Sequence, residues 1–143
     1  MLRKKVIVDT NALLIPGEFG VDIFYELEKL GYTRIIVPKV VLNELDRLRQ
    51  RPGLKGKEKR AAKIGYSLVL KYVHAEPDRF KVTINEEEGG GERNIGTDEW
   101  IVVLALKKKA AVLTNDELLK RKLSKAGIAT VYLRGGSRLE ESE

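Results

Sequence analysis

Short apolar segments alternate with longer segments of helical spacing along the whole chain, and this alternation most constrains how the chain can fold. The segments expected as strands are Lys5–Val8, Arg34–Val37, Arg79–Ile84, Ala111–Thr114 and Ile128–Leu133. The segments expected as helices are Val21–Leu30, Pro38–Arg49, Lys57–Val73, Asp98–Lys108 and Asp116–Ala126, with Thr97 as the cap before Asp98. Strands that alternate with helices predict an α/β domain in which helices cover both faces of a parallel sheet.

The length of 143 residues suits one compact domain, and a hydrophobic content of 43% supplies enough material for its core. We expect this domain over residues 1–134, followed by a polar, frayed tail over residues 135–143. The stretch Glu86–Gly91 (EEEGGG) is expected to be an acidic loop. No apolar run approaches the roughly 18 residues that span a bilayer, and no export signal is visible, so we expect a cytoplasmic protein without membrane contact.

Four acidic residues stand at the ends of expected strands or just inside the helices that follow them. They are Asp9 in VIVDTN, Glu44 in VVLNELDRL, Asp98 in GTDEWIVVLAL and Asp116 in AVLTNDELL. Because the carboxyl ends of parallel strands meet at one edge of a sheet, where ligands bind, these carboxylates should gather there. Neighbouring carboxylates cannot all ionise without a cation. With no cysteine and one histidine in the chain, the oxygen ligands predict a site for Mg²⁺ or Mn²⁺.

Three of these acids also have a simpler explanation at the end of a helix. Asp9 could cap a helix that follows it, although Pro16 predicts that any such helix is short. Asp98 and Asp116 open helices, where the helix dipole favours a carboxylate. Helix capping alone does not explain why these acids fall on the same expected edge.

Glu44 is the acid that a helix end does not explain. It lies inside the helix Pro38–Arg49, on the same face as Val41 and Leu48. The simpler alternative is an ion pair with Arg47 or Arg49. Asp46, two positions further on, should point to another side of the helix.

Basic residues exceed acidic ones, which gives a net charge of +6. They cluster in Lys55–Lys63 (KGKEKRAAK), Lys107–Lys109 and Lys120–Lys125 (KRKLSK). Such clusters attract phosphate backbones and indicate a nucleic-acid partner. The candidates for this contact are Lys55, Lys57, Lys59, Arg60 and Lys63.

Other folds with acids at the edge of a parallel sheet fit the sequence less well. A receiver-like phospho-acceptor domain needs an acidic pair after the first strand and an Asp at the end of the third, and neither is present. A phosphatase of the haloacid dehalogenase type needs a second Asp two residues after Asp9, where Asn11 stands. A dinucleotide-binding fold needs its glycine-rich loop after the first strand, whereas Gly89–Gly91 lies elsewhere.

In this order and spacing, the four acidic segments resemble the PIN domain family of metal-dependent ribonucleases. The resemblance covers roughly Lys5 to Leu133, and GTDEW, TNDELLKRKL and YLRGG look most like archaeal PIN proteins. Such proteins include VapC-type toxins and relatives of endonucleases that process ribosomal RNA.

The resemblance implies a three-layer α/β/α fold with a five-stranded parallel sheet in the order 3-2-1-4-5. It implies one or two Mg²⁺ or Mn²⁺ ions held by Asp9, Glu44, Asp98 and Asp116, with Glu99 as a further possible ligand and Asn11, Thr114 and Asn115 in support.

The implied activity is hydrolysis of single-stranded RNA or of structured ribosomal or transfer RNA, by a toxin of a toxin–antitoxin pair or by a processing enzyme. An antitoxin protein and a second copy of the chain are the implied protein partners. The alternative that keeps this fold is a catalytically weak scaffold that binds RNA or protein.

Overall fold

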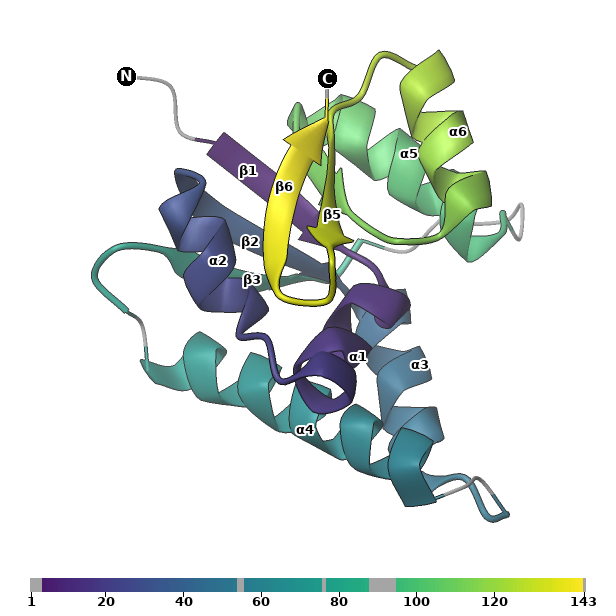
Figure 1. Ribbon diagram of the computed structural model, residues 1–143. Coiled ribbons are helices and arrows are strands. Elements are labelled where there is room, and N and C mark those ends of the chain that lie inside the picture. The colour runs from purple at the N-terminus through teal and green to yellow at the C-terminus, as the bar shows by residue number, and fades with distance from the viewer. Residues whose placement is uncertain (1–3, 54–55, 76, 88–94, 143) are drawn as a thin grey trace.

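The computed structural model describes residues 4–53, 56–75, 77–87 and 95–142 (Figure 1). The strands are β1 (Lys4–Val8), β2 (Tyr32–Pro38), β3 (Lys81–Asn85), β4 (Ala111–Leu113), β5 (Thr130–Arg134) and β6 (Arg138–Ser142). The helices are α1 (Thr10–Phe19), α2 (Ile23–Lys29), α3 (Lys39–Gln50), α4 (Gly56–Ala75), α5 (Thr97–Lys108) and α6 (Glu117–Lys125).

The strands form one sheet in the order β3-β2-β1-β4-β5-β6. All pairs are parallel except β5 with β6, which is antiparallel. The expected parallel order 3-2-1-4-5 is confirmed, and β6 is an addition at the edge. The carboxyl ends of the parallel strands therefore lie along one edge of the sheet, as the sequence predicts.

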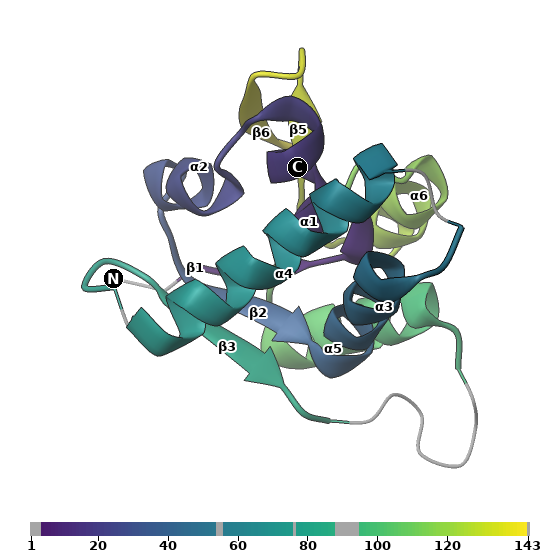
Figure 2. The same ribbon diagram turned by 90° about the horizontal axis from the view of Figure 1, so that it is seen from below.

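Helices cover the sheet on both faces, which makes the fold a three-layer α/β/α sandwich. Helices α1, α3 and α4 pack against one another on one face, where α4 crosses β2 and β3, and α5 and α6 pack on the opposite face (Figure 2). The central strand β1 is covered on both faces, so Val6, Ile7 and Val8 are fully buried. Each such side chain contributes about 1.5–3 kcal/mol to folding. Within the ranges that the structure describes, no helix has both the length and the apolar character to cross a membrane.

Helix α1 is longer than expected, because Pro16 lies inside it and does not end it. Proline lacks the N–H group that would bond the preceding turn. The helix nevertheless continues to Phe19, and the N–H group of its C-cap Gly20 donates to the Pro16 carbonyl (3.0 Å). Burial of Leu13 and Ile15 against the core explains why this helix tolerates the proline.

The expected frayed tail is wrong, since residues 138–142 form β6. Gly135 and Gly136 both have positive φ angles (62° and 70°) and turn the chain back after β5. The Leu139 N–H group donates to a carboxylate oxygen of Glu26 in α2 (3.2 Å). Glu141 pairs with Lys4 beside β1 (3.2 Å) and accepts a hydrogen bond from the Tyr32 hydroxyl. These contacts attach the end of the chain to elements more than a hundred residues earlier.

Helices α1 and α4 approach closely because small residues lie at their crossing. A Cβ atom built on Gly65 would lie 2.1 Å from the Leu13 carbonyl oxygen, and one built on Gly17 would lie 2.5 Å from the Ala61 Cα atom. Both obstacles are backbone atoms, so neither can move aside without shifting a helix. The position of α1, and of the strand end just before it, therefore depends on these glycines.

We predict that Gly65→Ala lowers the free energy of unfolding by about 1–3 kcal/mol, the usual cost of overpacking a core. The matched control is Gly56→Ala at the start of the same helix, where the described atoms leave open space around the added methyl group. Chemical denaturation of both variants measures the difference. Equal stability of the two variants would contradict the close approach of α1 and α4.

Candidate active site

Asp9 lies between the end of β1 and the start of α1, at the carboxyl edge of the sheet. Its Oδ1 atom accepts a hydrogen bond from the backbone N–H group of Ala12 (2.7 Å), which makes it the N-cap of α1. Its Oδ2 atom accepts a hydrogen bond from the Thr114 hydroxyl. Asp9 is only 6% exposed. The helix-cap alternative for Asp9 is therefore confirmed, and it coexists with a position at the expected edge.

Thr114 connects Asp9 with Asp116. The register of β1 and β4 pairs Val8 with Leu113, so the next residues of the two strands, Asp9 and Thr114, are neighbours. The fully buried Thr114 hydroxyl donates to Asp9 and accepts from the Asp116 backbone N–H group (3.0 Å). The predicted supporting position of Thr114 therefore corresponds to a direct hydrogen bond to the most buried acid.

Asp116 and Asp98 each stand at the start of a helix. Asp116 caps α6, since its Oδ1 atom accepts from the backbone N–H groups of Leu118 (2.8 Å) and Leu119 (3.1 Å). Asp98 lies in the first turn of α5. The expected cap at Thr97 is wrong: Gly96 is the N-cap and makes no side-chain capping bond, so the helix includes Thr97 as its first residue.

The charges of Asp98 and Asp116 act on the buried Asp9 carboxylate. Burial raises the pKa of Asp9 from 3.8 to about 6, against the opposing effect of the Thr114 and Ala12 hydrogen bonds, and the charges of Asp116 and Asp98 raise it further. The pKa of Asp98 is also raised, first by burial and then by Asp116. A buried carboxylate with two acidic neighbours is a site where a cation would be stabilising.

Glu99, the further ligand that the resemblance implies, is engaged in an ion pair outside this group of three acids. Its carboxylate pairs with Lys122 of α6 (2.7 Å), and this hydrogen bond is the main reason that the pKa of Glu99 is lowered and that of Lys122 is raised. Asp98 and Asp116 raise the pKa of Lys122 further. The sequence placed Lys122 only within a basic cluster, because nothing in it indicates a partner 23 residues away.

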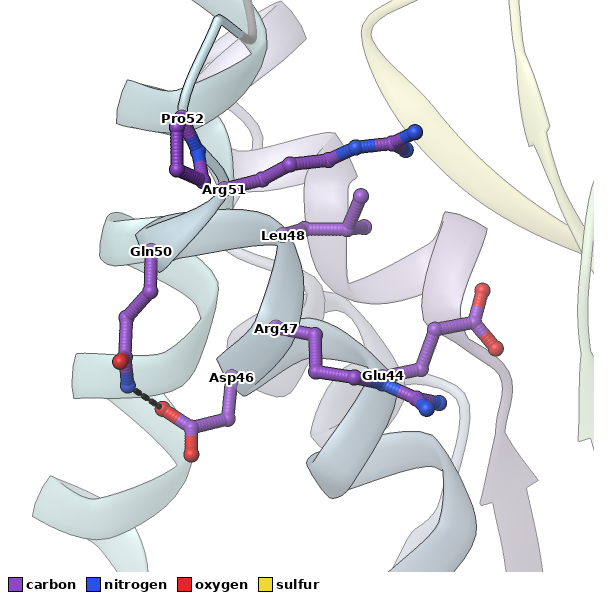
Figure 3. A pocket seen from close by; sticks show the side chains of 7 residues that line it. All are labelled: Glu44, Asp46, Arg47, Leu48, Gln50, Arg51 and Pro52. Carbon is purple, nitrogen blue, oxygen red and sulfur yellow. Dashed lines mark hydrogen bonds between the residues drawn. The ribbon is translucent and has the colours of Figure 1, made fainter.

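Glu44 projects from α3 on the same side as Arg47, Leu48 and Arg51, while Asp46 projects to the other side (Figure 3). Helix α3 packs against α1, the helix that Asp9 caps. The alternative ion pair of Glu44 with Arg47 or Arg49 does not form; Arg49 pairs with Asp46 (2.7 Å). Among the described residues, the Glu44 carboxylate makes no ion pair or hydrogen bond. Its predicted place among the metal ligands stays a prediction.

The two asparagines predicted as supporting residues differ in what they contact. The Asn115 side chain accepts a hydrogen bond from the Leu133 backbone N–H group (2.8 Å) and so attaches the end of β4 to β5. Asn11 is exposed in the first turn of α1. Asn115 therefore supports the edge of the sheet indirectly.

The basic residues predicted to contact nucleic acid lie on α4. Lys57, Arg60 and Lys63 are exposed and Lys59 is partly exposed, whereas Lys55 lies outside the described residues. Two lysines of the second cluster are paired with one acid after β3: Lys107 and Lys108 both pair with Glu87 (2.7 and 3.2 Å). Residues 88–91 of that expected acidic loop lie outside the described ranges.

The acids of this edge fit a hard metal ion by their chemistry, although their side chains do not converge on one point. In the part of the chain that the structure describes, no three Asp, Glu or His side chains come close enough to bind a single ion together. Charges influence one another over longer distances than the roughly 2.0–2.6 Å of a metal–oxygen bond. The raised pKa values of Asp9 and Asp98 are therefore compatible with carboxylates that lie too far apart to bind one ion together. Asp9, Asp98 and Asp116 together supply the oxygen ligands that Mg²⁺ and Mn²⁺ prefer.

Known proteins with similar sequences are ribonucleases. Residues 6–136 match the family described as PIN like domain. Ribonuclease VapC9 of Archaeoglobus fulgidus is 31% identical over 133 residues, which cover 93% of this chain and 85% of the relative. Ribonuclease VapC4 of Methanocaldococcus jannaschii is 28% identical over 133 residues, which cover 91% of this chain and 90% of the relative.

Solved structures with low sequence identity share the fold. The PIN domain endonuclease Utp24 has a TM-score of 0.64 at 23% identity, covering 96% of this chain and 90% of its own. A domain of a functionally unknown protein from Methanocaldococcus jannaschii has a TM-score of 0.64 at 24% identity, covering 98% and 95%. The family match contains the four predicted acids and the edge of the sheet where three of them interact, and this chain belongs to the PIN like domain family.

Proposed function

We propose that this protein is an endoribonuclease that depends on Mg²⁺ or Mn²⁺ and whose metal ligands are Asp9, Asp98 and Asp116, completed by Glu44. The observation that carries the proposal is the buried Asp9 carboxylate, whose pKa is raised to about 6 beside two further acids. Isolated buried carboxylates are costly, so a cluster of this kind is typical of a functional site. A divalent cation offsets that cost when it binds.

The side chains of this site have separable tasks in hydrolysis of an RNA phosphodiester bond. Thr114 orients Asp9 through its hydroxyl, and the Ala12 N–H group fixes the other carboxylate oxygen. Lys122 neutralises Glu99 and leaves Asp98 and Asp116 as the acids available at this end of α5 and α6. A bound divalent ion supplies polarisation of the scissile phosphate and a water of lowered pKa. A carboxylate of the cluster would accept a proton from the water that attacks the phosphorus atom.

RNA as the substrate rests on the relatives and on charge. Two relatives of similar length carry the name ribonuclease. The net charge is +6, and basic side chains of α3 and α4 are exposed. The proposal covers a toxin of a toxin–antitoxin pair and a processing enzyme alike, because both roles require the same hydrolysis.

Asp98→Asn should reduce metal-dependent RNA cleavage roughly 100-fold or more, because the amide cannot supply the negative charge that a metal ligand provides. Cleavage of a labelled single-stranded RNA in Mg²⁺ or Mn²⁺ measures the effect. Asp78→Asn, just before β3 at the opposite edge of the sheet, is the matched control and should retain wild-type activity. Cleavage at the wild-type rate by Asp98→Asn would contradict the assignment of the metal site. A wild-type protein that binds RNA but shows no metal-dependent cleavage would favour the scaffold alternative.

The stability of the metal-free protein should depend on Asp9 and on pH. The folded pKa is about 6 and the ordinary value is 3.8. Between these values the unfolded chain loses its proton first, so stability falls as pH rises from about 4 to 6 and the loss remains above 6. Asp9→Asn cannot ionise, so we expect its Tm to rise relative to wild type as pH increases from 4 to 7 in a chelator.

Adding Mn²⁺ at pH 7 should reduce or reverse that difference in Tm, because the ion stabilises only the wild-type carboxylate. Differential scanning calorimetry at each pH, with and without the ion, provides the measurement. A Tm difference that stays constant across the pH range would contradict the buried, ionising Asp9.

Glu44→Gln tests the fourth ligand. If Glu44 binds metal, we expect weaker Mn²⁺ binding and severely reduced cleavage, with at most about 1 kcal/mol lost from the free energy of unfolding, because no ion pair is broken. The matched control is Asp46→Asn on the opposite side of α3. Metal titration and cleavage rates decide the matter: wild-type values for Glu44→Gln would leave a site of three acids.

A further inference from the structure

The side of α3 that carries Glu44 also carries two arginines. Glu44, Arg47, Leu48 and Arg51 follow one another at spacings of three and four residues, which places them on one side of the helix. Figure 3 shows all four side chains projecting to this side, while Asp46 and Gln50 project to the other. A proposed metal ligand, an apolar side chain and two cations therefore share one surface.

A hollow of about 560 Å³ lies along this part of α3 and the residues that follow it. Its lining includes Glu44, Arg47, Leu48 and Arg51. Asp46 and Gln50 also line it, so the hollow extends around the helix from the side that carries these four residues. Its volume falls within the range of about 300–1,000 Å³ that is typical of ligand sites. Leu48 packs partly against the core and so supplies a fixed apolar wall.

The arginines of this helix differ in whether their charge is already engaged. Arg49 pairs with Asp46 (2.7 Å), and its guanidinium carbon lies 4.1 Å from the centre of the Tyr66 ring. Arg47 and Arg51 are exposed and form no ion pair with any residue that the structure describes. Arg47 and Arg51 therefore have their donors available for a ligand beside Glu44, and Arg49 does not.

We infer that Arg47 and Arg51 bind the phosphates of single-stranded RNA next to the bond that is cut, with an unstacked base in the hollow against Leu48; this rests on the proposed function. The guanidinium group binds phosphate through two parallel hydrogen bonds. The arginines also offset the repulsion between Glu44 and the incoming RNA backbone. The contact made by α3 is thus distinct from the one predicted for the lysines of α4.

The hollow favours a single strand over a duplex. A base within a duplex is paired and stacked and cannot enter a hollow, whereas an unpaired base packs on apolar side chains and on guanidinium planes. Phosphate contacts alone would not distinguish the two forms. The combination of Leu48 with two arginines is what assigns single-stranded RNA.

The test compares the double variant Arg47→Ala/Arg51→Ala with Arg49→Ala, which removes the same type of side chain from the other side of the helix. Fluorescence anisotropy measures binding of a labelled 12-nucleotide single-stranded RNA by each variant combined with Asp98→Asn, so that the RNA is not cut. We expect the double variant to bind about 10-fold or more weakly and its salt slope to shrink by about 1.4, for two phosphate contacts. Arg49→Ala should change affinity less than threefold, and circular dichroism confirms that each variant is folded.

Two further measurements separate this inference from the proposed function. With Asp98 intact, Mn²⁺-dependent hydrolysis of bis(p-nitrophenyl) phosphate, which has no flanking phosphates, should be unchanged in the double variant while cleavage of RNA weakens. The double variant should also lose less affinity for the 12-mer annealed to its complement than for the single strand.

Equal affinity of the double variant and Arg49→Ala for RNA would overturn the inference. An equal loss for duplex, or a matching loss of small-diester hydrolysis, would overturn it as well. In each case the proposed function stands as long as the wild type cleaves RNA with metal and Asp98→Asn does not.

Discussion

Burial of the Asp9 carboxylate is the constraint on which the rest of this edge depends. A charge removed from water must be compensated, and two hydrogen bonds do this only in part, which is why the pKa of Asp9 is raised to about 6. Both bonds come from the fold itself. The parallel register of β1 and β4 brings Thr114 to Asp9, and the start of α1 brings the Ala12 N–H group. The remaining cost is what a cation at this edge would offset.

The close crossing of α1 and α4 contributes to the same arrangement from the other side. Gly17 and Gly65 let the two helices approach until a Cβ atom would meet backbone. Because α1 begins directly after Asp9, a displacement of that helix would also displace the N–H group that bonds Asp9. Packing of small residues more than one helical turn away thus helps to fix the geometry of the acid.

The sequence was sufficient for strands β1 to β5, for helices α2 to α6 and for the edge at which Asp9, Asp98 and Asp116 lie. Short apolar segments such as VIV, IIV and AVL mark the buried strands, and a parallel sheet places all their carboxyl ends together. It was insufficient for β6, where Leu139 is the only apolar residue of RLEES. That strand is held by bonds to Lys4, Glu26 and Tyr32, which no local pattern contains. The Gly135–Gly136 pair was the available signal, since two glycines after a strand are typical of a hairpin.

The sequence likewise showed the clusters of basic residues but not the acids with which they form ion pairs. The clusters at Lys107–Lys109 and Lys120–Lys125 both indicated nucleic acid, yet Lys107 and Lys108 pair with Glu87, and Lys122 pairs with Glu99. Exposed cations without such partners among the described residues remain on α3 and α4, and Arg121 and Lys125 of α6 are exposed as well. Pairing therefore leaves fewer free cations to attract a phosphate backbone than the composition suggests.

Capping a helix and binding a metal ion are often treated as competing explanations for an acid at the end of a strand, and this edge shows why they are not. A carboxylate oxygen has two lone pairs. Each oxygen of Asp9 accepts one hydrogen bond, so each keeps a lone pair for a cation. Asp116 uses only Oδ1 to cap α6, which leaves its Oδ2 atom available. The caps also hold these side chains in place before any ligand arrives, and a ligand set that is already oriented loses less entropy on binding. The helix ends that offered the simpler explanation of these acids are therefore part of what makes a metal site here physically reasonable.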